Sequence, residues 1–154
     1  MLSAAQMQSL PAFFREIPDP RRAQGRRHRL STLLGIAAGA VLCGMRGYKA
    51  IADWAESLGQ KARERFGCRR EQGRYVVPSE SIIRNVLIRL NPAHLDGALQ
   101  HWNEVYAGED ESLAIDGKTL CNALDAEGHQ THVMSVVGHR TQICYTQKKW
   151  AVCP

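Results

Sequence analysis

The residues best suited to chemistry lie late in the chain, in the segment Ala114-Ile115-Asp116-Gly117-Lys118-Thr119-Leu120. A short apolar strand, 113–116, delivers one carboxylate, and a glycine and a lysine follow at once. This order is typical of metal-dependent phosphoryl transfer, in which several carboxylates hold two divalent metals about 4 Å apart. Asp116 is therefore a candidate metal ligand, and Lys118 a candidate phosphate contact. Plainer readings stay open, because Asp-Gly after a strand is also a turn signal and Lys118 could be an exposed strand lysine.

Other side chains near this segment that could bind a metal are better explained without one. Asp125 and Glu127 share a short connection with a glycine, which favours a solvated turn. His129 and His132 have a spacing of three, but on a strand they would point to opposite faces. We therefore expect surface or strand histidines, and only one catalytic carboxylate in this part of the chain.

Positive charge is concentrated in a second candidate site. The 154 residues carry a net charge of +5, and residues 21–29 hold five arginines: Arg21, Arg22, Arg26, Arg27 and Arg29. Such a cluster favours a nucleic-acid backbone, since phosphate contacts release counterions. A solvated basic loop is the open alternative. A second basic group over 63–74 is diluted by two glutamates and is weaker evidence.

Helical periodicity over the first hundred residues predicts the elements that position these sites. Helices are expected over 3–17, with Pro11 near its first turn, over 30–43, over 48–66, where Gly59 could break it, and from Ser79, an N-cap, to Leu90. Asn91-Pro92 is typical of a further helix start, and residues 69–78 read as a loop. Strands are expected over 113–116, 131–137 and 142–148, with a turn at 138–141.

The apolar segment 30–45 decides the expected compartment. It spans 16 residues, whereas a membrane-crossing helix needs about 20, so a buried core helix is predicted and no membrane partner is expected. The five cysteines are odd in number and form no C-x-x-C pair. Free thiols in a reducing cytoplasm are the simplest account.

Four groups of residues, in order, carry a resemblance to a known family. They are Ile17-Pro18-Asp19-Pro20-Arg21-Arg22 with Gly25-Arg26-Arg27-His28; Gly47-Tyr48 with Ile51-Ala52-Asp53-Trp54; Pro78-Ser79 with Ile82-Ile83-Arg84, Leu95-Asp96 and Trp102; and Ala114-Ile115-Asp116-Gly117-Lys118-Thr119 with His132-Val133-Met134-Ser135-Val136 and Gln147-Lys148-Lys149. The chain resembles the H-repeat-associated DDE transposases of bacterial insertion sequences.

This resemblance implies an α+β chain. Residues 1–107 would form an all-helical, DNA-contacting transposase-associated domain, and residues 108–154 the first strands of a truncated ribonuclease-H-like catalytic domain. Asp116 would be the first of three acidic residues that bind Mg²⁺ or Mn²⁺. The implied partners are DNA at the element ends, and a second copy of the chain or the intact transposase.

The family pattern leaves the chain after Lys149, before the second Asp and the Glu. We therefore expect a truncated transposase that binds DNA but has no complete catalytic triad, holds no metal stably and is inactive alone. The alternatives are a non-catalytic DNA-binding or inhibitory fragment, and a gene remnant without function.

Overall fold

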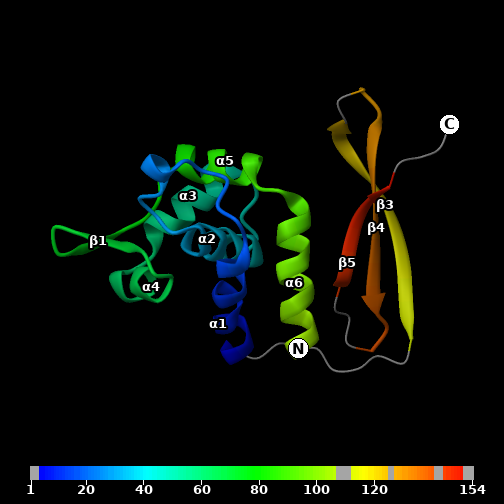
Figure 1. Ribbon diagram of the computed structural model, residues 1–154, viewed down its shortest axis with the longest axis horizontal. Helices are drawn as coiled ribbons and strands as arrows, with labels where there is room; N and C mark the ends of the chain where they lie inside the picture. The colour runs from blue at the N-terminus through cyan, green and yellow to red at the C-terminus, as the bar shows by residue number, and fades with distance from the viewer. Residues whose placement is uncertain (1–3, 107–111, 125–126, 141–143, 151–154) are drawn as a thin grey trace. The chain divides into compact units, whose positions relative to one another are not determined.

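The computed structural model describes residues 4–106, 112–124, 127–140 and 144–150 (Figure 1). The chain divides into two compact units, residues 2–98 and 99–154, of which each is described by itself. The predicted mixture of helices and strands is confirmed. The predicted domain boundary between 107 and 108 lies outside the described residues.

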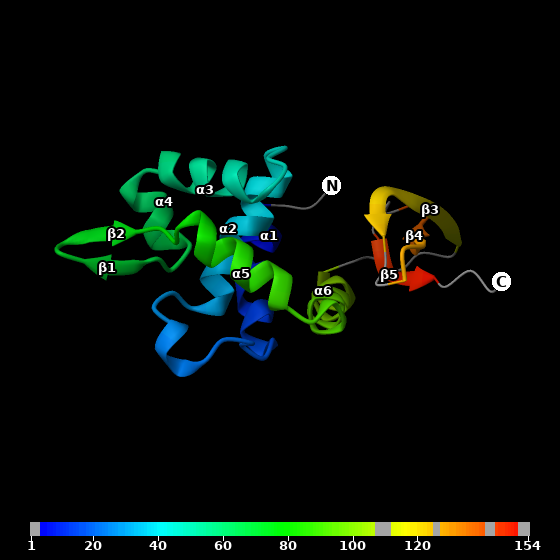
Figure 2. The same cartoon turned by 90° about the horizontal axis from the view of Figure 1, so that it is seen from above.

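Helices make up most of the first unit. These are α1 (Ala4–Phe13), α2 (Leu30–Leu42), α3 (Tyr48–Ser57), α4 (Gln60–Arg65), α5 (Glu80–Arg89) and the beginning of α6 (Pro92–Tyr106), with short 3-10 turns η1 (Phe14–Glu16) and η2 (Ala23–Gly25). The prediction that the segment from residue 30 is a central core helix is confirmed, because α2 contacts α1, α3 and α5 (Figure 2). Leu33 and Ile36 of α2 and Ile83 of α5 are almost completely buried.

A close approach between α2 and its neighbours depends on Gly39. A Cβ at this position would lie 2.9 Å from Cη2 of Trp54 and 3.2 Å from Cζ of Phe66. The two aromatic rings meet edge to face, with centroids 5.9 Å apart. Thr32, in the first turn of α2, donates a hydrogen bond of 3.0 Å to the carbonyl of Gly67. Together these contacts fix the end of α4 against α2.

One helix prediction is confirmed in detail and another needs correction. The helix expected over 48–66 breaks at Gly59 as anticipated, because Leu58 and Gly59 are extended and separate α3 from α4. Pro11 lies near the end of α1, not in its first turn, since the helix already begins at Ala4. Its ring packs on α2 near Gly35, where a Cβ would lie 3.5 Å from Pro11 Cγ, an ordinary van der Waals contact.

The sequence had suggested an all-helical first unit, but the structure also contains two strands there. Residues predicted as a loop form an antiparallel ribbon of β1 (Arg69–Glu71) and β2 (Arg74–Val76), in which Arg69 pairs with Val76 and Glu71 with Arg74. Gln72 and Gly73 connect the strands with φ of 46° and 81°. Positive φ at both central residues is the requirement of a type I′ turn. Polar three-residue strands and a Gln-Gly turn give no clear strand signal, which explains the error.

Caps at the two later helices follow the sequence more closely. Asn91 Oδ1 accepts a hydrogen bond of 3.0 Å from the backbone N–H of Ala93, and Pro92 is the first residue of α6. Ser79 occupies the cap position of α5, but its hydroxyl lies 3.1 Å from that of Ser81 and makes no bond to the helix backbone.

The second unit contains the end of α6 and an antiparallel sheet in the order β3 (Leu113–Leu124), β4 (Gln130–Gly138), β5 (Cys144–Trp150). β4 and the described part of β5 agree with the predicted strands, whereas β3 is longer than predicted. Asn103 of α6 donates a hydrogen bond of 2.8 Å to the carbonyl of Cys144 in β5. Within the described parts of the chain, no helix combines the length and apolar character needed to cross a bilayer.

Candidate nucleic-acid interface and the Asp116 sheet

The arginine segment is an ordered loop built around Arg21. This side chain is 8% exposed, and its Nε and Nη2 donate hydrogen bonds of 2.9 and 2.7 Å to the two carboxylate oxygens of Asp19. The same guanidinium donates to the carbonyl of His28 at 2.8 Å and to that of Gly25 at 3.2 Å. The prediction that Arg21 contacts DNA is therefore revised, because its donors already bind the loop itself.

Asp19 organises the loop from the acceptor side. It also accepts the backbone N–H of Arg21 at 3.0 Å, and the side-chain bonds from Arg21 hold the pKa of its carboxyl below the usual range. Arg26 adds bonds from Nε to the carbonyl of Arg21, 3.0 Å, and from Nη2 to that of Asp19, 3.3 Å. The carboxylate is therefore ionised at neutral pH and can accept all of these bonds.

The other predicted DNA contacts remain available on the outside of this loop. Arg22, Arg26, Arg27 and Arg29 are all exposed. Arg26 is partly engaged within the loop, since its guanidinium donates to two loop carbonyls, yet its side chain remains 49% exposed. A fixed loop that presents arginines in this way is suited to phosphate groups, which accept paired N–H donors.

His28 is a buried residue of this loop on which a charge from the β1–β2 ribbon acts. The histidine is 6% exposed, and burial lowers its pKa, with the positive charges of Arg69 and Arg21 adding to the effect. Glu71 of β1 has a lowered pKa, first from its bond to Arg69 and also from the charge of Arg27. Charges from the two basic groups of the sequence, at 21–29 and 63–74, thus act on titratable groups of the other segment.

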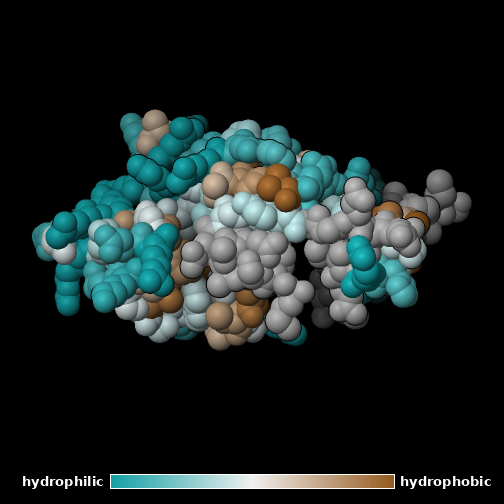
Figure 3. Space-filling view, turned by 90° about the horizontal axis from the view of Figure 1, so that it is seen from below, coloured by the Kyte–Doolittle hydropathy of each residue, from teal (hydrophilic) through white to brown (hydrophobic). Residues whose placement is uncertain are grey.

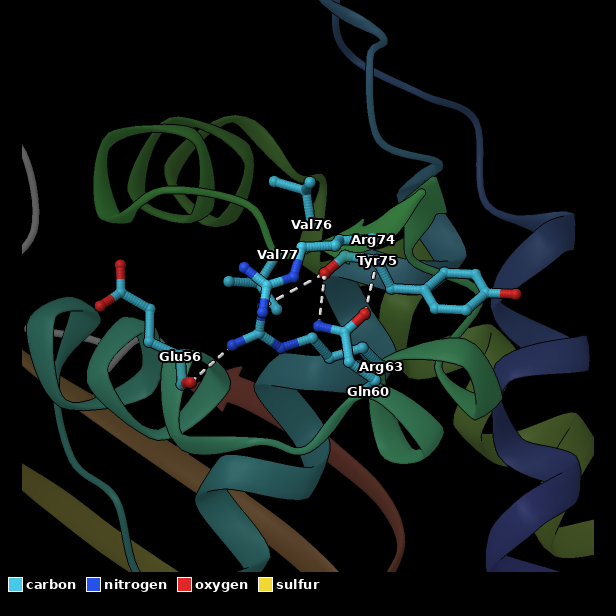
Figure 4. A pocket seen from close by; sticks show the side chains of 7 residues that line it. All are labelled: Glu56, Gln60, Arg63, Arg74, Tyr75, Val76 and Val77. Carbon is cyan, nitrogen blue, oxygen red and sulfur yellow. Dashed lines mark hydrogen bonds between the residues drawn. The ribbon is translucent and has the colours of Figure 1, made fainter. Parts of the chain in front are cut away.

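A hollow of about 520 Å³ lies beside the ribbon, lined by Glu56, Gln60, Arg63, Arg74, Tyr75, Val76 and Val77 (Figure 4). Arg63 spans it and donates to three carbonyls, those of Leu58 at 2.8 Å, Glu56 at 2.6 Å and Tyr75 at 3.2 Å. Its guanidinium is therefore part of the scaffold, although its sequence context had suggested only a diluted basic group.

Gln60 and Tyr75 complete the attachment of the ribbon. The Gln60 amide accepts the backbone N–H of Tyr75 at 2.7 Å and donates to its carbonyl at 3.3 Å (Figure 4). The Tyr75 hydroxyl donates to Glu64 at 2.6 Å, which raises the pKa of the phenol. Sequence reasoning missed these residues, and the break at Gly59 was the only signal that a helix begins at Gln60.

Asp116 lies inside β3 and not at a strand end or a turn. Its register partners across the sheet are Ser135 of β4 and Gln147 of β5. Gln147 Nε2 donates a hydrogen bond of 3.0 Å to Ser135 Oγ. Side chains of alternate residues share a face, so Lys118 and its register partner across β4, Lys149, stand on the Asp116 face. This correction removes the turn interpretation of Asp116-Gly117 and makes that face one of mixed charge.

The donor set around Asp116 does not by itself fit a two-metal centre. Among the described residues no three His, Cys, Asp or Glu side chains gather in a way that could hold a metal ion. The partners in the Asp116 row are a hydroxyl and an amide. His132 is on the other face, with Nδ1 2.9 Å from Thr119 Oγ1, and Glu127 lies 3.7 Å from His129. Asp125 lies outside the described residues.

Comparison with known proteins identifies the family. A family model described as DDE_Tnp_1-associated matches residues 12–103, more than half of the chain. The chain belongs to the DDE_Tnp_1-associated family. The matched region holds the arginine loop, the ribbon and helices α2 to α5, and the resemblance to H-repeat-associated DDE transposases is confirmed.

Two curated relatives extend the comparison. The chain is 28% identical over 152 residues, 96% of its length, to the "Uncharacterized protein in dhlA 3'region" of Xanthobacter autotrophicus, of which it covers 50%. It is 29% identical over 123 residues, 77% of its length, to the "H repeat-associated putative transposase YhhI" of Escherichia coli strain K12, of which it covers 31%. No solved structure matches. Family and relatives together indicate a transposase-related role.

Proposed function

We propose that residues 1–107 form the DNA-binding part of a transposase of bacterial insertion sequences. The observation that carries the proposal is the ordered arginine loop within the family-matched region. Because Asp19 fixes Arg21 inside the loop, the outer arginines are held ready to meet phosphates without first being ordered. Such contacts would position the protein on DNA at the element ends without specifying a sequence.

We further propose that β3–β5 are the opening strands of a ribonuclease-H-like catalytic domain. The antiparallel order and the position of Asp116 within the first strand support this. Ile115, its neighbour on the opposite face, is 70% exposed, which favours a sheet that packs against further elements. The chain spans half or less of the length of the curated relatives it matches, so the activity of the longer protein enters only as part of this proposal.

Asp116 would then be one of three acidic ligands for Mg²⁺ or Mn²⁺, which would stabilise the phosphoryl-transfer reaction at DNA. The described residues supply one such carboxylate, and no reaction step is assigned to them. A chain that binds DNA without a full ligand set would compete with intact transposase for element ends or associate with it. This non-catalytic, inhibitory role is the second candidate, favoured by the neutral partners of Asp116.

DNA binding is tested with the purified chain and a short fluorescent duplex of random sequence, titrated from about 50 to about 200 mM salt. We expect Arg27→Gln with Arg29→Gln to reduce the slope of log K against log salt by about 1.8, or about 0.9 for each lost phosphate contact. Arg84→Gln with Arg89→Gln on α5 is the matched control, since it removes the same charge from the same unit. Absence of binding, or binding that ignores salt, would contradict the proposal.

Catalysis is tested separately. We expect no cleavage of supercoiled DNA by the purified chain with magnesium or manganese. Cleavage that Asp116→Ala abolishes would show instead that the chain completes the site by itself.

A further inference from the structure

The β1–β2 ribbon carries positive charge at Arg70 and Arg74. Glu71 is paired with Arg69 at 2.5 Å. Arg70 and Arg74 are exposed, and neither side chain forms a hydrogen bond or an ion pair within the described ranges. They belong to different register pairs, Arg70 with Tyr75 and Arg74 with Glu71, so they stand on opposite faces of the ribbon.

The tip of the ribbon holds a residue that its backbone does not favour. Gln72 has φ 46° in a turn where Asn, Asp or Gly is usual. An L-residue in this region costs about 1 kcal/mol or more. The strained position carries an exposed primary amide, and a glutamine amide can pair with the N6 and N7 edge of adenine in the major groove.

The ribbon is held firmly at its base. Three side chains of α4 secure one residue of β2: Gln60 and Arg63 bond to the Tyr75 backbone, and Glu64 accepts its hydroxyl. An ordered ribbon loses little conformational freedom when it docks, and this favours binding. Within the described residues, no hydrogen bond to α4 involves the side chains of Arg70, Gln72 or Arg74.

Further positive charge borders the ribbon. The charge of Arg27 lowers the pKa of Glu71, and that of Arg69 lowers the pKa of His28, so positive charge of the arginine loop acts on β1. On the face shown in Figure 3, hydrophilic side chains cover most of the left end of the first unit, the end at which Figure 2 places β1 and β2. A surface of this kind, a rigid projection with phosphate-binding groups beside it, has the charge and shape to meet duplex DNA.

We propose that the tip of the β1–β2 ribbon enters the major groove of duplex DNA. Arg70 and Arg74, on opposite faces, meet the phosphates on the two walls of the groove, and Gln72 meets base edges on its floor. The major groove, about 12 Å wide, admits a two-stranded ribbon, whose strands lie about 4.8 Å apart. The arginine loop binds the adjacent backbone. This inference rests on the proposed DNA binding of the unit and names the element that reads sequence.

The test begins with selection of a duplex from a random library by the full chain. Binding is then measured to the selected duplex and to a shuffled duplex of the same composition. We expect Arg70→Gln with Arg74→Gln to weaken binding to both duplexes and to reduce the salt slope by about 1.8. Methylation of guanine N7 in the selected duplex, which blocks the major groove, should weaken binding by the unaltered chain.

Gln72→Gly separates base reading from turn formation. Glycine adopts positive φ freely, so this variant should melt no lower than the unaltered chain. We expect it to lose at least about fivefold of the preference for the selected duplex, the lower end of what one bidentate base contact supplies, with an unchanged salt slope. Gln72→Asn keeps both the turn and an amide and should lose less.

The outcomes separate this inference from the proposed function. If the arginine-loop variant weakens binding but the ribbon double variant binds like the unaltered chain, the loop binds DNA and the ribbon proposal is wrong. If preference for the selected duplex is lost in Arg84→Gln with Arg89→Gln and kept in Gln72→Gly, α5 and not the ribbon reads sequence. A selection that enriches no sequence also overturns it. If the chain binds no duplex, both proposals fail.

Discussion

Replacement of Arg21 by alanine should destabilise the first unit far more than replacement of its neighbour Arg22. Arg21 is buried and makes two bonds to Asp19 and two to carbonyls of the loop, whereas Arg22 is exposed. Removing one partner of a buried ion pair costs about 3–5 kcal/mol, because a charge is left without its partner. Asp19 is 17% exposed and keeps its bond from the backbone N–H, so we expect a loss of about 2–4 kcal/mol.

The measurement is urea unfolding of the full chain, followed by far-ultraviolet circular dichroism. Arg22→Ala removes an equal charge from an exposed position of the same loop and should change the free energy of unfolding by no more than about 0.5 kcal/mol. Arg21→Lys keeps the charge but loses the planar pair of donors and should fall between the two. If Arg21→Ala and Arg22→Ala unfold at the same urea concentration, the loop is not organised as described.

Acid titration gives the same prediction a second readout. The pKa of Asp19 is lowered in the folded protein, chiefly by its bonds to Arg21. The stability contributed by this carboxylate is therefore present above the unfolded-state pKa, about 3.9, and is lost as the pH falls through the folded-state pKa. Arg21→Ala should reduce this acid dependence, while Arg22→Ala should leave it unchanged.

Further predictions concern packing, protonation and one long-range hydrogen bond. Gly39→Ala should destabilise the fold by about 1–3 kcal/mol, since the new methyl would stand 2.9 Å from Trp54. Gly97→Ala in α6 is the control, because nothing lies within 4 Å of the new methyl. It should raise the melting temperature, since alanine is favoured over glycine by up to about 1 kcal/mol in helices. The pKa of His28 is lowered by burial and by the charges of arginines. The stability contributed by the neutral imidazole should therefore be complete above the unfolded-state pKa of about 6.5 and decrease as the pH falls toward the folded-state pKa. His28→Phe should make the melting temperature less dependent on pH between about pH 7 and 5. Thr32→Val should cost about 1 kcal/mol in urea unfolding, because the Gly67 carbonyl loses its 3.0 Å bond, and an unchanged midpoint would show that the bond contributes nothing.

Local signals in the sequence predicted the helices well and the ribbon poorly. The uninterrupted apolar run of α2 and the Asn91-Pro92 start of α6 depend on near neighbours, so periodicity and capping rules find them. The ribbon depends on residues distant in sequence, since Gln60 of α4 replaces a neighbouring strand for Tyr75. No local pattern reports such a bond.

The candidate site was predictable in composition but not in the role of each residue. Counting charge found the arginine segment, yet the sequence could not tell the buried Arg21 from the exposed Arg22, because the difference comes from Asp19 and from carbonyls at positions 25 and 28. Likewise Asp116-Gly117 carries a strong turn signal. Pairing with β4 through Ser135 overrides that signal and keeps both residues within a strand.

The paired bonds between Gln60 and Tyr75 also limit edge-to-edge pairing between copies of this chain. A two-stranded ribbon has an outer edge on each strand, and an open edge can recruit a strand from another molecule. Here the backbone groups of Tyr75 that face away from β1 are already occupied by a side-chain amide. Gln60→Ala would free the N–H of Tyr75 and leave its carbonyl with the bond from Arg63, so part of this edge would open to a strand from a second chain.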